Sequence, residues 1–242
     1  MNIGLCIRIV GLLLMLFSLG NLPSMVLGWV QEDGTAEIFG QAFAATAISG
    51  VLLSLLTQRV NTELQIRDGF LVTAAFWIVL SLYGSLPFVL SDAIEVSVFD
   101  AFFESVSGLT TTGATVLAGL DTLPQSILLY RQLLQWLGGI GIIVLAVAVL
   151  PMLGIGGVQL YRAESTGPAK DSKLTPRITS TAKALFSIYL GLTVACAAAY
   201  YLAGMSAFDA ISHAFSTIAI GGFSTHDSSM GYFQSDVILL IA

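Results

Sequence analysis

The stretch FDAFFESVSGLTTTGATV, which runs from Phe99 to Val116, separates two long apolar runs and is unlike either of them. Its last part holds three consecutive threonines, a glycine, an alanine and another threonine, and residues 105–116 carry no charge. This hydroxyl-rich segment therefore lies where apolar side chains would otherwise continue. Its position decides which fold the chain can adopt.

The composition around this stretch is that of a membrane protein. Of the 242 residues, 56% are hydrophobic and 10% are charged, whereas a soluble domain usually carries about 25% charged residues. Several apolar runs reach the roughly 20 residues that a helix needs to cross about 30 Å of hydrocarbon. They are Leu5–Leu27, Phe39–Leu56, Phe70–Leu90, Ser126–Leu150 and Ala184–Ala203, and a further run begins at Val237.

The placement of Lys and Arg predicts how the chain is oriented, because these residues accumulate on the cytoplasmic side. With a cytoplasmic N-terminus, only Arg131 falls in the outer half of the protein. The residues on the cytoplasmic side are then Arg8, Arg59, Arg67, Arg162, Lys170, Lys173, Arg177 and Lys183. Most Asp and Glu residues fall on the outer side, where an acidic face would raise the local concentration of cations.

The opening stretch occurs twice. FDAISHAFSTIAIGGFST, which starts at Phe208, aligns with it without a gap at an offset of 109 residues. The Phe-Asp-Ala start, Ser107 with Ser216, and Gly113 with Gly222 all match. Each copy follows one span and precedes another. Repeats of this kind mark pseudo-symmetric membrane assemblies whose functional site lies between the repeats.

Each copy is expected to begin with a half-length helix. Asp100–Leu109 would extend about 15 Å at 1.5 Å per residue, which suits a re-entrant segment and not a span. Asp100 and Asp209 are predicted to be the N-caps, because Asp can accept from the free N–H groups of the first turn. The helix C-terminus, with roughly half a negative charge, would then favour a cation near the middle of the membrane.

The chain must return from that depth in a non-helical conformation, which is tolerated only inside protein or beside water. The two return strands are Thr110–Thr115 and Ala219–Ser224. Such strands can replace the hydration shell of a monovalent cation with carbonyl oxygens. Gly113 and Gly222 would reach positive φ at low cost. Neither strand holds a carboxylate, which calcium and magnesium sites usually recruit.

The motifs SGLTTTGAT and STIAIGGFST resemble those of the Trk/Ktr/HKT superfamily of potassium transporters, and the two additional N-terminal helices are similar to its bacterial TrkH-type branch. The resemblance implies an all-α membrane protein of repeated transmembrane helix, re-entrant pore helix with filter loop, and transmembrane helix. It also implies a selectivity filter. Its residues would be Thr110, Thr111, Thr112, Gly113, Ala219, Ile220, Gly221 and Gly222, with potassium at the carbonyls of Thr111, Thr112, Ile220 and Gly221.

The resemblance covers the whole chain but only about the first half of a family member, in which four such loops occur. A fragment is therefore expected. The predicted organisation is a two-helix extension (1–65), a first pore-loop repeat (66–160), a cytoplasmic linker (161–175) and a truncated second repeat (176–242).

Two polar residues outside the return strands are expected to support the pore. Arg131 near the start of the fourth span needs a partner if it is buried, and Glu104 on the half-helix is the candidate. Snorkelling of Arg131 to the membrane surface is the alternative. His213 aligns with Glu104 in the second copy and is expected to be a buried histidine held by a neighbour, with a proton relay as the alternative.

The function predicted from these residues is potassium uptake across a bacterial inner membrane, with no covalent chemistry and no organic cofactor. Alternatives are a path for sodium or ammonium, or an intramembrane enzyme that uses Asp209, His213, Ser216 and Thr217. The resemblance implies a homodimer and a cytosolic nucleotide-binding regulatory subunit, which the basic cluster from Lys170 to Lys183 would contact unless it binds anionic lipid. Channel and proton- or sodium-coupled symport mechanisms both remain open.

Overall fold

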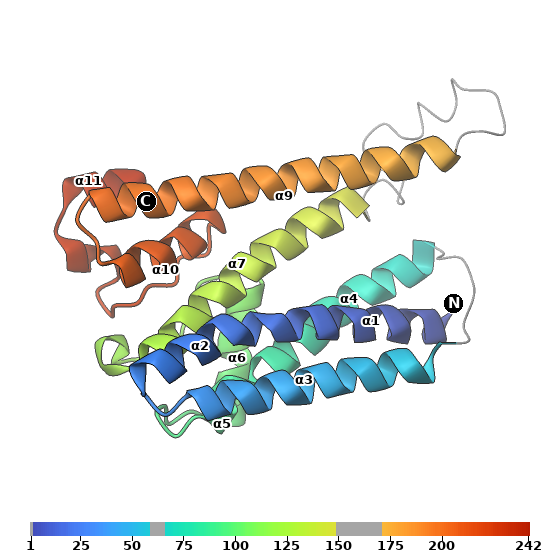
Figure 1. Cartoon of the computed structure of the whole chain (residues 1–242), viewed down its shortest axis with the longest axis horizontal. Coiled ribbons are helices and arrows are strands. Elements are labelled where there is room, and N and C mark those ends of the chain that lie inside the picture. The colour runs from blue at the N-terminus through green and yellow to red at the C-terminus, as the bar shows by residue number, and fades with distance from the viewer. Residues whose placement is uncertain (1, 59–65, 149–170) are drawn as a thin grey trace.

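The computed structural model describes residues 2–58, 66–148 and 171–242, and within these ranges the chain forms helices and loops only (Figure 1). The helices in chain order are α1 (Ile3–Ser18), η1 (Leu19–Asn21), α2 (Leu22–Gln31), α3 (Ala36–Leu56), α4 (Ile66–Gly84), α5 (Leu86–Leu90), α6 (Val98–Leu109), η2 (Leu120–Thr122), α7 (Gln125–Ala148), α9 (Asp171–Leu202), α10 (Ala207–Ile218), η3 (Ser229–Phe233) and α11 (Asp236–Ile241).

Among the residues that the structure describes, four helical segments are long and apolar enough to cross a membrane: Ile3–Gln31, Ala36–Leu56, Asp68–Leu90 and Ser180–Leu202. Each overlaps one of the predicted runs. The predicted span that starts at Ser126 corresponds to α7, which has 24 residues and so has the length of a span. The first half of α7 holds several buried polar side chains, which include Arg131, Gln132 and Gln135.

Two of the spans are interrupted near the end of the bundle that lies opposite the N-terminus (Figure 1). The 3-10 turn η1 separates α1 from α2, and Ser85 separates α4 from α5. A proline lies in the first turn of both α2 and α5. Proline has no N–H to donate, so it is tolerated there but would break the interior of a continuous helix.

The two-helix extension packs tightly on itself and against the first repeat. A side chain added at Gly11 of α1 would lie 2.8 Å from the carbonyl oxygen of Gly50 on α3, so these helices cross at a distance that only glycines allow. At the opposite end Asp33 accepts hydrogen bonds from Thr35 and from Ser126 at the start of α7. The extension is thereby anchored to the span that follows the first loop.

The half-helices α6 and α10 have 12 residues each, and the predicted N-caps are wrong by three residues in both. Ser97 and Ser206 are the N-caps, and their Oγ atoms accept from the N–H groups of Asp100 and Asp209 at 3.1 Å. Asp100 also accepts from the Ser97 N–H, which completes a capping box. The aspartates therefore stand at the third helical position, where such a box needs an acceptor.

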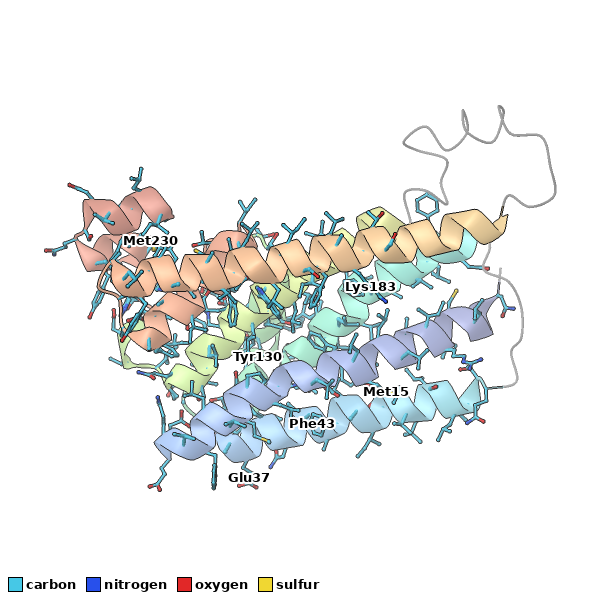
Figure 2. The ribbon with its side chains drawn as sticks, turned by 45° about the horizontal axis from the view of Figure 1, so that its top comes forward. Met15, Glu37, Phe43, Tyr130, Lys183 and Met230 are labelled. Atoms are coloured by element: carbon cyan, nitrogen blue, oxygen red, sulfur yellow. The ribbon has the colours of Figure 1, made fainter. Side chains whose placement is uncertain are left out.

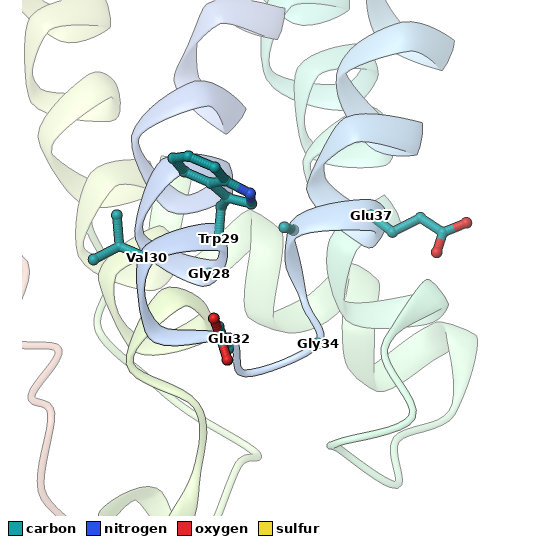
Figure 3. A pocket seen from close by; sticks show the side chains of 7 residues that line it. Gly28, Trp29, Val30, Glu32, Gly34 and Glu37 are labelled. Atoms are coloured by element: carbon teal, nitrogen blue, oxygen red, sulfur yellow. The ribbon is translucent and has the colours of Figure 1, made fainter.

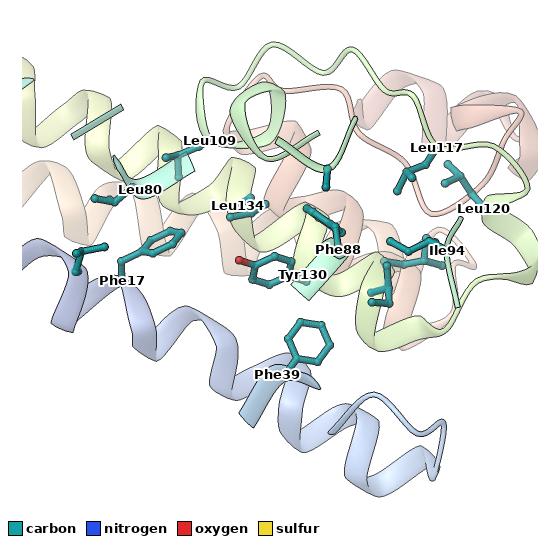
Figure 4. Packing of buried hydrophobic residues seen from close by; sticks show 14 of the residues in the cluster. Phe17, Phe39, Leu80, Phe88, Ile94, Leu109, Leu117, Leu120, Tyr130 and Leu134 are labelled. Atoms are coloured by element: carbon teal, nitrogen blue, oxygen red, sulfur yellow. The ribbon is translucent and has the colours of Figure 1, made fainter. Parts of the chain in front are cut away.

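The apolar core gathers around Tyr130 of α7 (Figure 4). The ring of Tyr130 lies 5.3 Å from that of Phe39 and 5.4 Å from that of Phe88. Its hydroxyl donates to the carbonyl of Gly84, where α4 ends. Side chains project from the helices into the spaces between them (Figure 2). The extension and the first repeat thus share one core.

Part of the predicted cytoplasmic side lies outside the described residues. This holds for Arg59, Arg162 and Lys170, and for most of the predicted linker 161–175. Residues 171–175 belong to the first turns of α9.

Candidate functional site

The two return strands lie side by side, which brings together residues that are 108 positions apart in the sequence. A Cβ atom built on Gly113 would lie 1.9 Å from the carbonyl oxygen of Gly221. Such a distance is far shorter than any van der Waals contact, so glycine at this position is what allows the strands to approach. The first strand therefore contacts the carbonyl of a residue in the second.

Both strands repeat the same unusual backbone conformation. Thr111 and Gly113 have φ of 56° and 79°, and their counterparts Ile220 and Gly222 have φ of 54° and 81°. Positive φ is rare for residues other than glycine, and for β-branched Thr and Ile it is a marked outlier. The sign of φ alternates along each strand, and such an alternation turns successive N–H groups to one side of the chain.

The hydrogen bonds of these strands agree with that arrangement. The N–H groups of Thr111 and Thr112 donate to the carbonyls of Gly108 and Ser107 on α6. In the second copy Ile220 and Gly221 donate to Thr217 and Ser216 on α10. Among the described residues, no hydrogen bond is donated to the carbonyls of residues 110–113 or 219–222. These eight predicted filter residues thus offer oxygen atoms that no described protein group occupies.

The return strands are fastened to their half-helices by equivalent contacts. In the first copy Thr115 donates to Glu104 at 2.9 Å and accepts from the N–H of Leu117. In the second copy Ser224 bonds to His213 at 3.0 Å and accepts from the N–H of His226.

The contact between Ser224 and His213 also bears on the tautomer of the His213 ring. The Nδ1 of His213 lies 2.9 Å from the carbonyl of Asp209, so in the neutral ring Nδ1 donates and Nε2 accepts from Ser224. Each half-helix thus holds its own strand through one polar side chain.

Arg131 is fully buried and does not snorkel. Its Nε lies 2.7 Å from Glu104, which is the partner proposed from the sequence. Its other nitrogens donate to Thr115 and to the carbonyl of Ser224, and its guanidinium lies 4.3 Å from the centre of the Phe223 ring. Removing either member of such a buried pair leaves an uncompensated charge, which costs about 3–5 kcal/mol.

A third link joins the two copies at the edge of the loops. His226 contacts Asp121 through Nδ1, and its Nε2 lies 3.4 Å from Asp209. The hydrogen bond from His226 is the main reason that the pKa of Asp121 lies below its usual value. Tyr232 stacks on the same imidazole at a ring distance of 3.5 Å. Residues 121 and 226 thus connect the segments that follow the two strands.

Two of the cavities that border the described residues lie at α10 and between α2 and α3. One, of about 350 Å³, is lined by the second strand and by His213, Ser216 and Thr217 of α10. The other, of about 580 Å³, lies between α2 and α3 and is lined by Trp29, Glu32 and Glu37, among others (Figure 3). No residue of the two strands lines the second cavity, so the first is the one relevant to this site.

The residue types that an intramembrane enzyme would need are otherwise engaged. Ser216 donates to the carbonyl of His213, and the Thr217 hydroxyl bonds to that of Tyr200. Asp209 accepts from Thr225. None of these contacts pairs a nucleophile with a base, and the contact of His213 with Ser224 has a non-catalytic counterpart in Glu104 and Thr115.

Sequence reasoning missed three contributors to this site. Ser97 and Ser206 cap the half-helices and share the 109-residue offset, so a longer alignment of the two copies would have found them. Gln135 of α7 accepts a hydrogen bond from the N–H of Phe223 at 3.1 Å. No sequence pattern signals this contact, because it joins one copy to the other.

The family model described as TrkH, cation transport protein, matches residues 35–242. The Trk system potassium uptake protein TrkH of Vibrio parahaemolyticus is 61% identical over 97% of this chain, and that of Escherichia coli is 56% identical over 96%. The Trk system potassium uptake protein TrkG of Escherichia coli is 44% identical over 96% of the chain. These names describe transport proteins and not enzymes.

The crystal structure of the potassium transporter TrkH from Vibrio parahaemolyticus matches with a TM-score of 0.87 and 54% identity over the whole chain. This confirms the predicted fold class, an all-α membrane protein with repeated pore-helix units. The match covers 48% of that protein, and the chain spans about half the length of the curated relatives it matches.

Proposed function

Because the chain belongs to the TrkH family of cation transport proteins, we propose that it supplies two of the filter loops of a potassium uptake protein. The ion would lose its hydration shell to main-chain carbonyls of residues 110–113 and 219–222. The carbonyls of Thr111, Thr112, Ile220 and Gly221 would be the main ligands. Gly113 and Gly222 would give the strands the backbone conformation that they need.

The observation that carries this proposal is the pattern of backbone hydrogen bonds in the two strands. N–H groups of these strands bond back to α6 and α10, whereas the carbonyls of residues 110–113 and 219–222 receive no described bond and so are free to coordinate an ion. The same residues are held at positive φ in both copies. Such strain persists only where the surrounding structure enforces it, and it concentrates at functional sites.

The half-helices support the same function through their charge distribution. Each strand begins at the C-terminal end of a half-helix, where the helix dipole places roughly half a negative charge. No carboxylate lies within either strand. Neutral carbonyl oxygens and helix dipoles suit a monovalent cation that must bind and leave quickly.

The cellular setting is part of the proposal. Lys and Arg residues gather on the side that would face the cytoplasm, which supports an inner-membrane protein with a cytoplasmic N-terminus. We further propose that the protein works as a homodimer with a cytosolic nucleotide-binding regulatory subunit. Support for this is the family resemblance and the basic cluster between residues 170 and 183.

Ion flux tests the proposal directly. The whole protein is reconstituted in proteoliposomes, and uptake of radioactive rubidium is measured with excess potassium, sodium or ammonium as competitor. Potassium should suppress rubidium uptake, and sodium should leave most of it intact. Equal suppression by sodium or ammonium would identify a path for another monovalent cation. An absence of uptake together with hydrolytic activity would reject transport altogether.

A further inference from the structure

We propose that Arg131 and Gln135 of α7 are positioning residues that hold the second filter strand in place against the first, and thereby set the ion selectivity of the pore. This inference rests on the proposed function. It goes beyond a brace within one repeat, because both side chains reach from the first repeat to the second.

Arg131 contacts both strands through separate nitrogen atoms. Nε and Nη2 bond to Glu104 and Thr115, which fasten the first strand, at 2.7 and 3.0 Å. Nη1 donates to the carbonyl of Ser224 in the second strand at 2.9 Å. The planar guanidinium has donors in a fixed geometry. It therefore fixes the distance between the two strands as well as joining them.

Gln135 lies one helical turn further along the same face of α7, since residues four apart are neighbours on a helix surface. Its Oε1 accepts from the N–H of Phe223 at 3.1 Å. A Cβ at Gly221 would lie 2.4 Å from the Gln135 Cδ atom, so the amide also packs directly against a filter residue. Arg131 and Gln135 thus hold two successive residues, one through its carbonyl and the other through its N–H.

Burial makes these contacts hard to replace. Both side chains have no exposed surface, so water is not available to take over a lost hydrogen bond. A buried N–H left without a partner costs about as much as its desolvation. Loss of Gln135 should therefore shift the segment after Gly222 toward another partner, and the carbonyls of Gly221 and Gly222 with it.

The contact that Arg131 makes with the second strand has no counterpart at the equivalent position of the second repeat. The residue 109 positions after Arg131 is Leu240, which has no donor and is 88% exposed. Likewise His213 replaces Glu104. The second strand therefore receives its fixed position from α7 of the preceding repeat in addition to His213 of its own.

Gln132 offers a matched control for a test by substitution. It has the same side chain, lies on the same helix and is also fully buried. Neither of its amide atoms has a hydrogen-bond partner among the described residues. Gln135→Met and Gln132→Met thus remove the same amide from the same helix, but only the first removes a bond to the filter strand.

Two measurements on the whole protein separate the parts of the inference. Hydrogen exchange of the peptide that contains Phe223 should become about tenfold faster in Q135M and stay unchanged in Q132M. The ratio of rubidium to sodium uptake should fall by about tenfold in Q135M, which corresponds to ~1.4 kcal/mol. It should stay within about twofold of wild type in Q132M. The ratio does not depend on how many molecules are folded.

The outcomes are distinguishable. Faster exchange with unchanged selectivity would overturn the positioning role, and equal effects of Q135M and Q132M would overturn the specific contact. A wild-type protein that does not prefer rubidium over sodium would instead reject the proposed function. If Q135M does not reach the membrane, Arg131→Lys tests the same junction. Lysine can keep its pairing with Glu104 but cannot reach three partners, so the same loss of selectivity is expected, and wild-type selectivity in R131K would contradict the inference.

Discussion

A side chain at position 113 would occupy the place of a proposed ion ligand, the carbonyl of Gly221, which lies 1.9 Å from the Cβ position. Gly113→Ser should therefore lower the ratio of rubidium to sodium uptake by about tenfold or more. Displacing one such oxygen costs on the order of one hydrogen bond, ~1–2 kcal/mol. The measurement is competitive uptake in proteoliposomes, normalised to the amount of protein inserted.

Gly119 provides the control for the backbone cost of this substitution. It has φ of 72°, close to the 79° of Gly113, but the nearest atom to its Cβ position is 3.5 Å away. Gly119→Ser carries the same penalty for a left-handed conformation, roughly 1–2 kcal/mol, without the displaced carbonyl. A loss of selectivity in G119S as large as in G113S would show that general destabilisation, and not the filter, is responsible.

Ile220 and Thr111 show how much of the strand conformation is imposed from outside. Branched side chains avoid positive φ, yet both residues adopt it at equivalent places. Their N–H groups bond to the last turn of a half-helix, which holds the peptide against its local preference. The local sequence therefore predicts the opposite conformation, and only the repeat reveals that the position is special.

At the scale of the element, the start of each half-helix depends on a serine. Ser97→Ala and Ser206→Ala should each lower the free energy of unfolding by ~1 kcal/mol, the usual loss for an N-cap. The midpoint of thermal unfolding in detergent measures the effect. Ser228→Ala is the control, because Ser228 precedes η3 without making a side-chain cap bond. A larger loss of unfolding free energy in Asp100→Ala than in Ser97→Ala would show that the aspartate is the principal cap.

The link between η2 and the segment after α10 should depend on pH. The pKa of Asp121 is lowered in the folded state, mainly by the hydrogen bond from His226. A lowered carboxyl pKa contributes stability that is complete above the unfolded value, about 3.9, and is lost as the pH falls through the folded value. Asp121→Asn should therefore lower the unfolding midpoint at pH 6, and the difference from wild type should vanish toward acid pH.

Exposed Asp92, which has no described side-chain partner, supplies the comparison for this titration. Asp92→Asn should leave the unfolding midpoint unchanged both at pH 6 and at acid pH. A difference between D121N and wild type that grows in acid would mean that the Asp121 carboxylate opposes folding, contrary to the geometry.

At the scale of the whole molecule, most of the fold could be predicted from apolar length and from the repeat. Spans, half-helices and return strands follow from these two patterns, because the hydrocarbon thickness sets the length of each helix. The breaks of two spans, at Ser85 and at η1, were not predicted. They depend on Pro23 and Pro87, and a proline in the first turn of a new helix is consistent with either a break or a kink.

The contacts between the repeats were largely beyond sequence reasoning. Glu104 could be proposed as the partner of Arg131 because a buried charge needs an opposite charge. The bonds from α7 to Phe223 and Ser224 use backbone groups, which every residue possesses, so no side-chain pattern distinguishes them. Similarly, Asp100 was predicted as a cap because an aspartate is a good cap in isolation, whereas the helix begins earlier at Ser97.

The three bonds of Arg131 also bear on how such a chain can change over evolutionary time. Arg131 depends on the side chains at 104 and 115, so we expect substitutions at these three positions to be coupled. Arg131 contacts Ser224 only through the backbone carbonyl of Ser224, whereas the Ser224 side chain bonds to His213. The two repeats could therefore diverge in their side chains while the backbone contact between them persists.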